Sequence, residues 1–167
     1  MIKVDAINNM NEIDRLKYMN LLVKGQLSSE KDHLANISNV TAIIKACIDR
    51  INWCGFYLLK HNELILGPFQ GLPACNRIQI GKGVCGKSVE LKEPIIVDNV
   101  LTFDGHIACD ENSRSEIVLP IIVEENIYGV LDIDSPFFNR FNDMHLKYLR
   151  ELVSIMNQYI NWDALVK

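Results

Sequence analysis

The amino-acid sequence predicts an α+β fold in which N- and C-terminal helices pack on a central, largely antiparallel sheet of six strands. Apolar residues recur at helical spacing near both ends of the chain, whereas six short β-rich runs occupy its middle. Two links between consecutive runs are short enough to be hairpins, which join antiparallel neighbours. A doubly wound parallel sheet would instead alternate strands with helices.

The composition fits one folded domain over residues 1–167, since single domains usually hold about 100–200 residues. Hydrophobic residues make up 49% and charged residues 23%, so the chain can fill a core and is not disordered. No apolar run reaches the roughly 18 residues of a membrane span, and the first residues do not resemble a signal peptide. We therefore expect a cytoplasmic protein without membrane attachment. The net charge of −4, with scattered Lys and Arg, argues against nucleic-acid binding.

Two helices are expected before the first strand. Residues 10–24 form the first, and Gly25 is expected to end it. The second begins after a cap at Ser28 or Ser29 and runs to about Asp49. The apolar residues at helical spacing are Ile13, Leu16, Leu21 and Val23 in the first helix, and Leu34, Ile37, Val40, Ile43, Ile44 and Cys47 in the second.

Six β-rich runs follow, separated by Gly, Pro, Asn and Asp. They are residues 53–60, 63–68, 76–80, 93–98, 116–123 and 126–134. Residues 84–92 suit a short helix, whereas the polar stretch 99–115 has no period and, as a long loop, is expected to be functional. A last helix starts near Asn142 and packs through Leu146, Leu149, Leu152, Val153, Met156 and Ile160.

Five cysteines are present: Cys47, Cys54, Cys75, Cys85 and Cys109. A reducing compartment seldom keeps structural disulfides, so they serve packing, metal binding or chemistry. Cys47 lies on an apolar stripe and is expected to pack in the core. Cys85 opens the short helix, whose dipole favours a thiolate, unless it is there only for tight packing. Cys109 lies among carboxylates that oppose a thiolate, so it needs a cation, His106 or a positively charged substrate group.

Three carboxylates are expected close together on the sheet. Glu116 lies on one strand, and Asp132 and Asp134 share a face of the next because side chains alternate with period two. Buried carboxylates cost several kcal/mol unless paired, so they bind a cationic group or carry a proton, unless they face solvent. Trp53 and Tyr57 on the first strand could wall a small pocket, although core packing would explain them equally well.

A zinc site and a dinucleotide-binding site are two alternatives to a site built on these carboxylates. Cys75, Cys85, His106 and Cys109 could bind zinc, but no close Cys-x-x-Cys pair supports it, and we expect no metal. The run 81–86 matches GxGxxG, yet Asp98 comes early for a ribose-binding acid, and the neighbouring strands form a meander. A turn that brings backbone close to a ligand or neighbour is the better interpretation, and we expect no cofactor.

Six motifs carry a resemblance to a known family. They are WCGFYLL (53–59), LGPFQGLPAC (66–75), RIQIGKGVCG (77–86), FDGHIACD (103–110), SEIVLPI (115–121) and GVLDIDSP (129–136). In collinear order over about residues 30–160, they resemble the free methionine-(R)-sulfoxide reductases, which have the GAF fold. Leu72 departs from the lysine usual there, and Cys54 from a small or aliphatic residue.

The resemblance implies a GAF-like homodimer that reduces free methionine (R)-sulfoxide with electrons from thioredoxin. It places the redox cysteines at Cys75, Cys85 and Cys109, and the substrate pocket at Trp53, Glu116, Asp132 and Asp134. We expect Tyr57 to bind the substrate as well, because of its place beside Trp53 on the first strand. We expect Cys109 to attack the sulfoxide sulfur while Glu116 or Asp134 protonates the oxygen, and Cys75 to resolve the sulfenic acid. Cys85 is an alternative for either thiol. The competing hypothesis is a non-catalytic GAF-type sensor of a small molecule or of oxidation, although this chain is short for an added output domain.

Overall fold

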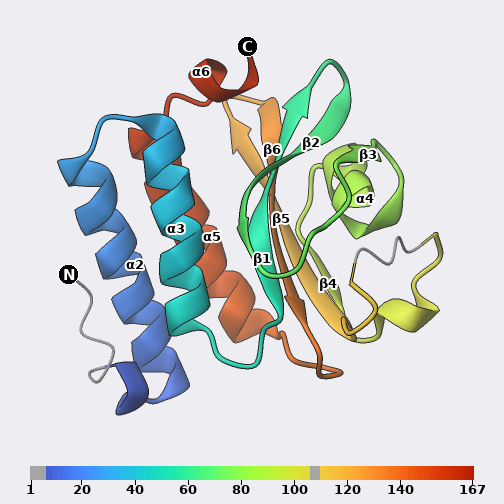
Figure 1. Cartoon of the computed structure of the whole chain (residues 1–167), viewed down its shortest axis with the longest axis horizontal. Coiled ribbons are helices and arrows are strands. Elements are labelled where there is room, and N and C mark those ends of the chain that lie inside the picture. The colour runs from blue at the N-terminus through green and yellow to red at the C-terminus, as the bar shows by residue number, and fades with distance from the viewer. Residues whose placement is uncertain (1–6, 106–109) are drawn as a thin grey trace.

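The computed structural model describes residues 7–105 and 110–167, which form a six-stranded sheet with helices on both faces (Figure 1). The strands are β1 (Trp53–Lys60), β2 (Glu63–Gln70), β3 (Arg77–Gln79), β4 (Ile95–Val97), β5 (Ser115–Val123) and β6 (Asn126–Ser135). The helices are α2 (Glu12–Ser29), α3 (His33–Cys47), α4 (Gly83–Leu91), the 3-10 turn η1 (Val100–Thr102), α5 (Asp143–Tyr159) and α6 (Asp163–Val166).

The sheet has the order β3-β2-β1-β6-β5-β4, and every neighbouring pair is antiparallel. The predicted α+β class and the predicted antiparallel sheet of six strands are therefore confirmed. The two edge strands, β3 and β4, are shorter than the runs 76–80 and 93–98 that predicted them. Each of them pairs on one side only, so fewer ladder hydrogen bonds hold it extended.

Helices α2, α3 and α5 cover one face of the sheet (Figure 1). Alternate residues of the central strands point into this layer, among them Phe56 of β1, Leu119 of β5 and Leu131 of β6. Cys47 and Cys54 are both buried in this core, as the apolar stripe predicted for Cys47. Most of the hydrophobic core therefore lies between the helices and the sheet.

The opposite face of the sheet is covered by the short helix α4 and its flanking loops (Figure 1). The residues of β1 that point this way are Trp53 and Tyr57, which pack with Val84 and Val89 of α4. This second, smaller cluster contains the residues that alternate with those of the main core. It contains Cys85 as well, so the face with α4 is where the predicted chemistry belongs.

The boundary between the first two helices differs from the prediction. Gly25 does not end α2, which continues to Ser29, so neither Ser28 nor Ser29 caps the second helix. The N-cap of α3 is Asp32, whose side chain accepts a backbone N–H from the first turn. Glycine inside a helix costs only about 1 kcal/mol relative to alanine, and burial of Leu27 beyond it offsets that cost.

Three of the apolar residues at helical spacing are exposed: Ile13 by 44%, Leu21 by 65% and Leu34 by 56%, and of these Leu34 was expected on a buried face. Helical spacing locates the centre of an apolar face well, but residues at its margin turn toward solvent.

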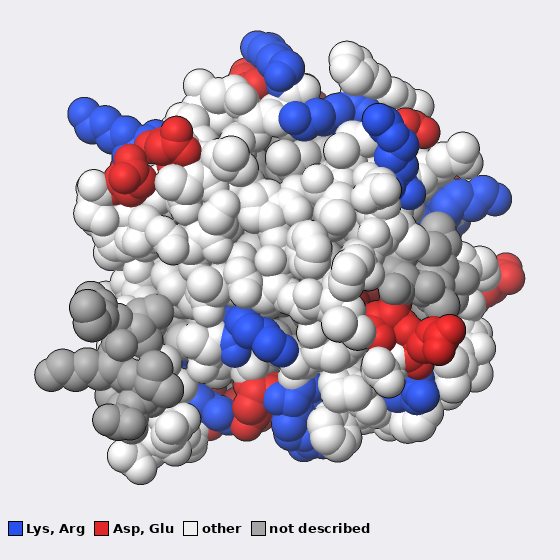
Figure 2. Space-filling model, viewed as in Figure 1, with Lys and Arg blue, Asp and Glu red and all other residues white. Residues whose placement is uncertain are grey.

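Charged side chains ring the face of the molecule shown in Figure 2, with Lys and Arg interspersed among Asp and Glu. A continuous basic patch is not seen on this face, which agrees with the scattered positive charge of the sequence. In the described parts of the chain, the helices are too short or too polar to cross a bilayer.

Candidate active site

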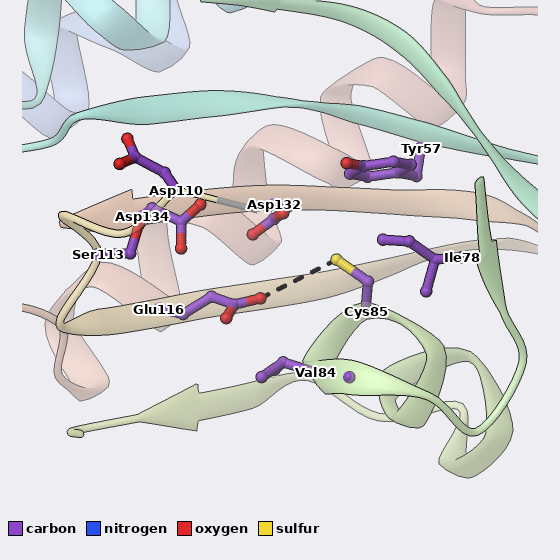
Figure 3. Close-up of a pocket in the computed structure, with 10 residues that line it drawn as sticks. Tyr57, Ile78, Val84, Cys85, Asp110, Ser113, Glu116, Asp132 and Asp134 are labelled. Carbon is purple, nitrogen blue, oxygen red and sulfur yellow. Dashed lines mark hydrogen bonds between the residues drawn. The ribbon is translucent and has the colours of Figure 1, made fainter. Parts of the chain in front are cut away.

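A small cavity of about 30 Å³ lies between α4 and the sheet (Figure 3). It is lined by Tyr57, Ile78, Gly83, Val84, Cys85, Asp110, Ser113, Glu116, Asp132 and Asp134. The polar part of the lining is rich in carboxylates, and none of the described lining residues is Lys, Arg or His. The described lining is thus acidic and includes the thiol of Cys85.

The register of β5 and β6 brings the three predicted carboxylates together. Glu116 lies directly opposite Asp134 in the ladder. Asp132 precedes Asp134 by two residues in β6, so its side chain lies on the same face of the sheet. Figure 3 shows the carboxyl groups of all three directed into the cavity. The predicted grouping is therefore confirmed, and the alternative of a solvent-facing strand is wrong for Glu116 and Asp132, which are buried.

Burial and mutual repulsion keep these acids from ionising at their usual pH. Burial raises the pKa of Asp132 to about 6, although contacts with Cys85 and Glu116 act in the opposite direction. The pKa of Glu116 is raised well above its usual value by burial and then by Asp132 and Asp134. The pKa of Asp134 is raised in the same way. Such groups can hold a proton near neutral pH, as a general acid must.

Cys85 points into this acidic cavity from the first turn of α4 (Figure 3). Its Sγ donates to Oε1 of Glu116 at 4.0 Å, and the side chain is buried. The pKa of the thiol is raised well above 9.0, first by burial and then by Asp132 and Glu116. The predicted lowering of its pKa by the helix dipole is therefore wrong, because desolvation and nearby carboxylates outweigh the dipole.

Cys75 is partly buried and disulfide-bonded, in the loop that follows β2. Its carbonyl oxygen accepts a hydrogen bond from the hydroxyl of Tyr57 at 3.0 Å. Because Tyr57 lines the cavity, this bond fixes the Cys75 loop beside the acids. The zinc set weighed above loses a ligand here, since a disulfide sulfur is not a thiolate.

Trp53 lies behind the cavity and does not line it. Its ring stacks between Tyr57 and Phe69, with centroids 5.9 and 5.4 Å away, and its indole N–H donates to the carbonyl of Leu72. Trp53 therefore packs in the core, which was the alternative to a place in the pocket wall, whereas Tyr57 does line the cavity as predicted. The side chain of Leu72 itself is 59% exposed, away from the cavity.

His106 and Cys109 lie outside the described residues, but the segment that follows them reaches the cavity. Asp110 and Ser113 both line it, and Nδ2 of Asn52 donates to Oδ2 of Asp110 at 2.7 Å and to Oγ of Ser113 at 3.0 Å. Asn52, Asp110 and Ser113 were not predicted from the sequence as site residues. The signal that could have identified Asn52 was its position directly before β1, the strand that carries Trp53 and Tyr57.

The glycine-rich run 81–86, which contains Cys85, forms a tight turn that leads into α4. The N–H of Gly81 donates to the carbonyl of Gly86 at 2.9 Å, and a Cβ on Gly86 would lie 2.3 Å from the carbonyl oxygen of Gln79. Gly86 thus lets α4 approach β3 closely, which confirms the interpretation of this run as a packing turn.

Sheet, helices and acidic cavity together define a GAF domain, and a family model described as "GAF domain" matches residues 40–161. The chain is 44% identical over 151 residues to the free methionine-R-sulfoxide reductase of Escherichia coli, covering 90% of this chain and 92% of that protein. It is 39% identical to the Saccharomyces cerevisiae enzyme of the same name, covering 93% and 91%. The chain therefore belongs to the free methionine-R-sulfoxide reductase family of GAF-domain proteins.

A solved structure supports the same assignment. The free methionine-R-sulfoxide reductase of Neisseria meningitidis, determined in complex with its substrate, is 34% identical to this chain. The two superpose with a TM-score of 0.88 over 93% of this chain and 94% of that one.

Proposed function

We propose that this protein reduces free methionine (R)-sulfoxide to methionine. The observation that carries the proposal is the acidic cavity, which groups Glu116, Asp132 and Asp134 beside a disulfide-bonded Cys75. Sulfoxide reduction by a thiol needs a proton donor for the oxygen and a second thiol for the oxidised sulfur. Family membership supplies the substrate class.

In the proposed mechanism, the sulfur of Cys109 attacks the sulfoxide sulfur, and the sulfoxide oxygen is transferred to Cys109. Glu116 or Asp134 protonates that oxygen, methionine leaves, and Cys109 becomes a sulfenic acid. The thiol of Cys75 then condenses with the sulfenic acid, which forms a disulfide and releases water. The two thiols of thioredoxin reduce that disulfide and become oxidised themselves.

The choice of Cys75 and Cys109 over Cys85 rests on the thiol environments. Cys75 is disulfide-bonded, whereas Cys85 is a free, buried thiol with a raised pKa. A thiolate is the nucleophile in this chemistry, so the acidic surroundings of Cys85 disfavour it as the attacking group. The disulfide-bonded state of Cys75 supports its role as the resolving thiol.

Preference for a free amino acid follows from the charge of the cavity. We propose that Asp132 accepts the α-ammonium group of the substrate, which a peptide-bound methionine lacks, so that a peptide would leave a buried acid unpaired. The cavity of about 30 Å³ has room for about one or two water molecules. Lining residues must therefore separate to admit a substrate.

We further propose that residues 1–167 act as one GAF domain, in a homodimer, in the cytoplasm. Among the described residues, Cys47, Cys54 and Cys85 are free thiols, which fits a reducing compartment. The partners are then the free amino acid and thioredoxin, without nucleic acid, membrane or cofactor.

Thioredoxin-coupled oxidation of NADPH tests the function, with the R and S epimers of free methionine sulfoxide supplied separately. We expect turnover of the R epimer only, and its loss in Cys109→Ser. Activity that survives in Cys109→Ser would assign the nucleophile to Cys85. Absence of turnover with both epimers would overturn the proposal in favour of a sensor.

A further inference from the structure

We propose that the same cavity binds a divalent cation of the zinc type through Cys85, Glu116 and Asp132, and that the bound cation excludes the substrate. The binding half of the proposal stands on the geometry of the cavity alone. The exclusion half rests on the proposed function, because it requires that Asp132 accept the substrate's ammonium group.

The ligand atoms of these three residues are already close together. Sγ of Cys85 and one carboxylate oxygen each of Glu116 and Asp132 lie within 4.8 Å of one another. Zinc binds thiolate sulfur at about 2.3 Å and carboxylate oxygen at about 2.0–2.2 Å. If side-chain rotation shortened the distances between these ligand atoms by about 1 Å, the three atoms would occupy three corners of a tetrahedron around the ion. The fourth corner would be open to water.

A buried oxygen without a partner points independently to a cation. Oδ1 of Asp132 is buried and accepts no hydrogen bond from the described residues, and the whole residue is only 6% exposed. Figure 3 shows this carboxyl group directed at the space between Cys85 and Glu116. A buried acceptor left unsatisfied costs about 1–3 kcal/mol, which a cation at this point would recover.

The charge of the whole cavity favours a cation as well. Asp110 and Asp134 add two further carboxyl groups to its lining, and the described lining residues bring no cationic side chain. One thiol among the ligands favours zinc over magnesium or calcium, which prefer oxygen ligands only. The free space of about 30 Å³ suits an ion with one water, whereas calcium usually takes six to eight oxygen ligands.

Zinc binding is measured first on the double variant Cys75→Ser/Cys109→Ser, by competition with a chromophoric chelator. This background removes the two thiols of the proposed mechanism, which would otherwise compete for the metal. We expect one zinc ion per chain, and at least a tenfold loss of affinity when Cys85→Ala is added. Adding Cys54→Ala instead is the matched control, because Cys54 is buried on the opposite face of the sheet.

Asp132→Asn on the same background guards against a folding defect caused by Cys85→Ala. It conserves the size of the side chain and removes one ligand charge, so it also should weaken zinc binding at least tenfold. Zinc affinity that is unchanged by both substitutions, with folding verified by circular dichroism, would overturn the metal site.

Exclusion of the substrate is measured in a single turnover by Cys75→Ser with free methionine (R)-sulfoxide. Thioredoxin and thiol reagents are left out because they bind zinc themselves. We expect methionine formation to slow at least tenfold at saturating zinc, with an inhibition constant equal to the dissociation constant, and to recover with EDTA. Zinc that binds without slowing turnover would overturn the exclusion. A lack of turnover without zinc would overturn the proposed function and leave the metal site standing.

Discussion

Among the carboxylates that line the described cavity, Asp132 is the one with a buried oxygen that has no described hydrogen-bond partner. Its Oδ1 has no described hydrogen-bond partner, although the residue is buried. A ligand that brings a positive group would therefore gain a charge-assisted hydrogen bond, worth about 1.5–3 kcal/mol.

Asp132→Asn should raise the KM for free methionine (R)-sulfoxide about 10- to 100-fold, because that bond is lost while the size of the side chain is kept. Steady-state kinetics with the thioredoxin-coupled assay would measure the change. Asp98→Asn serves as the control, since Asp98 is exposed and does not line the cavity. An unchanged KM in Asp132→Asn would disprove the assignment of the ammonium site.

Burial of His145 leads us to predict how the stability of the protein depends on pH. It is 1% exposed, and its pKa is lowered below 6.5, first by burial and then by Arg140, against the opposing effects of Glu12 and Asp49. In the unfolded chain the histidine takes up a proton at a higher pH than in the folded protein. The stability that its neutral form provides is therefore present above about pH 6.5 and is lost as the pH falls below it.

His145→Gln removes this titration and keeps an acceptor for Arg140. We expect the melting temperature to fall less between pH 7 and pH 5 in the variant than in the wild type. Differential scanning calorimetry at both pH values measures this. Parallel losses in the two proteins would mean that other groups set the pH dependence.

The sequence predicted the three clustered acids correctly, because alternation along a strand is a local property. It failed for the pKa of Cys85, since that depends on Glu116 and Asp132, which are 31 and 47 positions away in the chain. Local sequence shows a helix start, and only the tertiary structure shows the acids opposite it.

At the level of elements, the position of α4 depends on one close approach. Gly86 lies where a Cβ would come within 2.3 Å of the Gln79 carbonyl, and Cys85 is its direct neighbour. Any side chain at this position must move α4 away from β3.

Gly86→Ala should therefore destabilise the protein by about 1–3 kcal/mol and reduce activity, because the backbone must shift to relieve the contact. Gly25→Ala is the matched control: no atom lies within 4 Å of the added Cβ, and alanine favours a helix interior by about 1 kcal/mol. Urea denaturation of both variants would measure the difference. A stable Gly86→Ala would contradict the close packing of α4.

The same pair of glycines shows why element boundaries were harder to predict than elements. Gly25 and Gly86 both lie inside helices. The sequence predicted a helix stop at Gly25, whereas Gly86 falls within the short helix predicted over residues 84–92. Burial of Leu27 extends α2 past its glycine, and this packing is not visible in local propensity.

On the scale of the whole molecule, Arg140 ties the helical layer to the end of the sheet. Its guanidinium lies 2.5 Å from Oε1 of Glu12 in α2 and 2.8 Å from Oδ1 of Asp49 in the link before β1. It also contacts Nε2 of His145 in α5 at 2.8 Å, and its own side chain is only 5% exposed. Three segments distant in sequence thus share one buried cation.

Arg140→Ala should destabilise the protein by about 2 kcal/mol or more, because it removes the buried cation that Glu12 and Asp49 share and leaves Asp49 paired with Arg15 alone. The partners are only partly buried, so solvent limits the loss. Arg77→Ala, which breaks an exposed pair with Glu63, should cost less than about 1 kcal/mol. Equal effects in chemical denaturation would show that the Arg140 cluster adds nothing beyond a surface ion pair.

The fold class was predictable for the whole molecule, but the order of the strands was not. Short links identify the β1–β2 and β5–β6 hairpins, because their turns are local. The pairing of β1 with β6 brings together residues that are distant in the chain, such as Trp53 and Asp134. The local sequence of neither strand indicates this pairing.

That central pairing also sets when the protein can fold during its synthesis. Everything from α2 to β4 is synthesised before β6, yet β1 cannot complete its ladder until β6 has been made. The nascent chain must therefore wait with one side of β1 unpaired, which is a state prone to aggregation and a substrate for chaperones. Glu116 belongs to β5 and Asp132 and Asp134 belong to β6, so the site can form only after both strands have been synthesised.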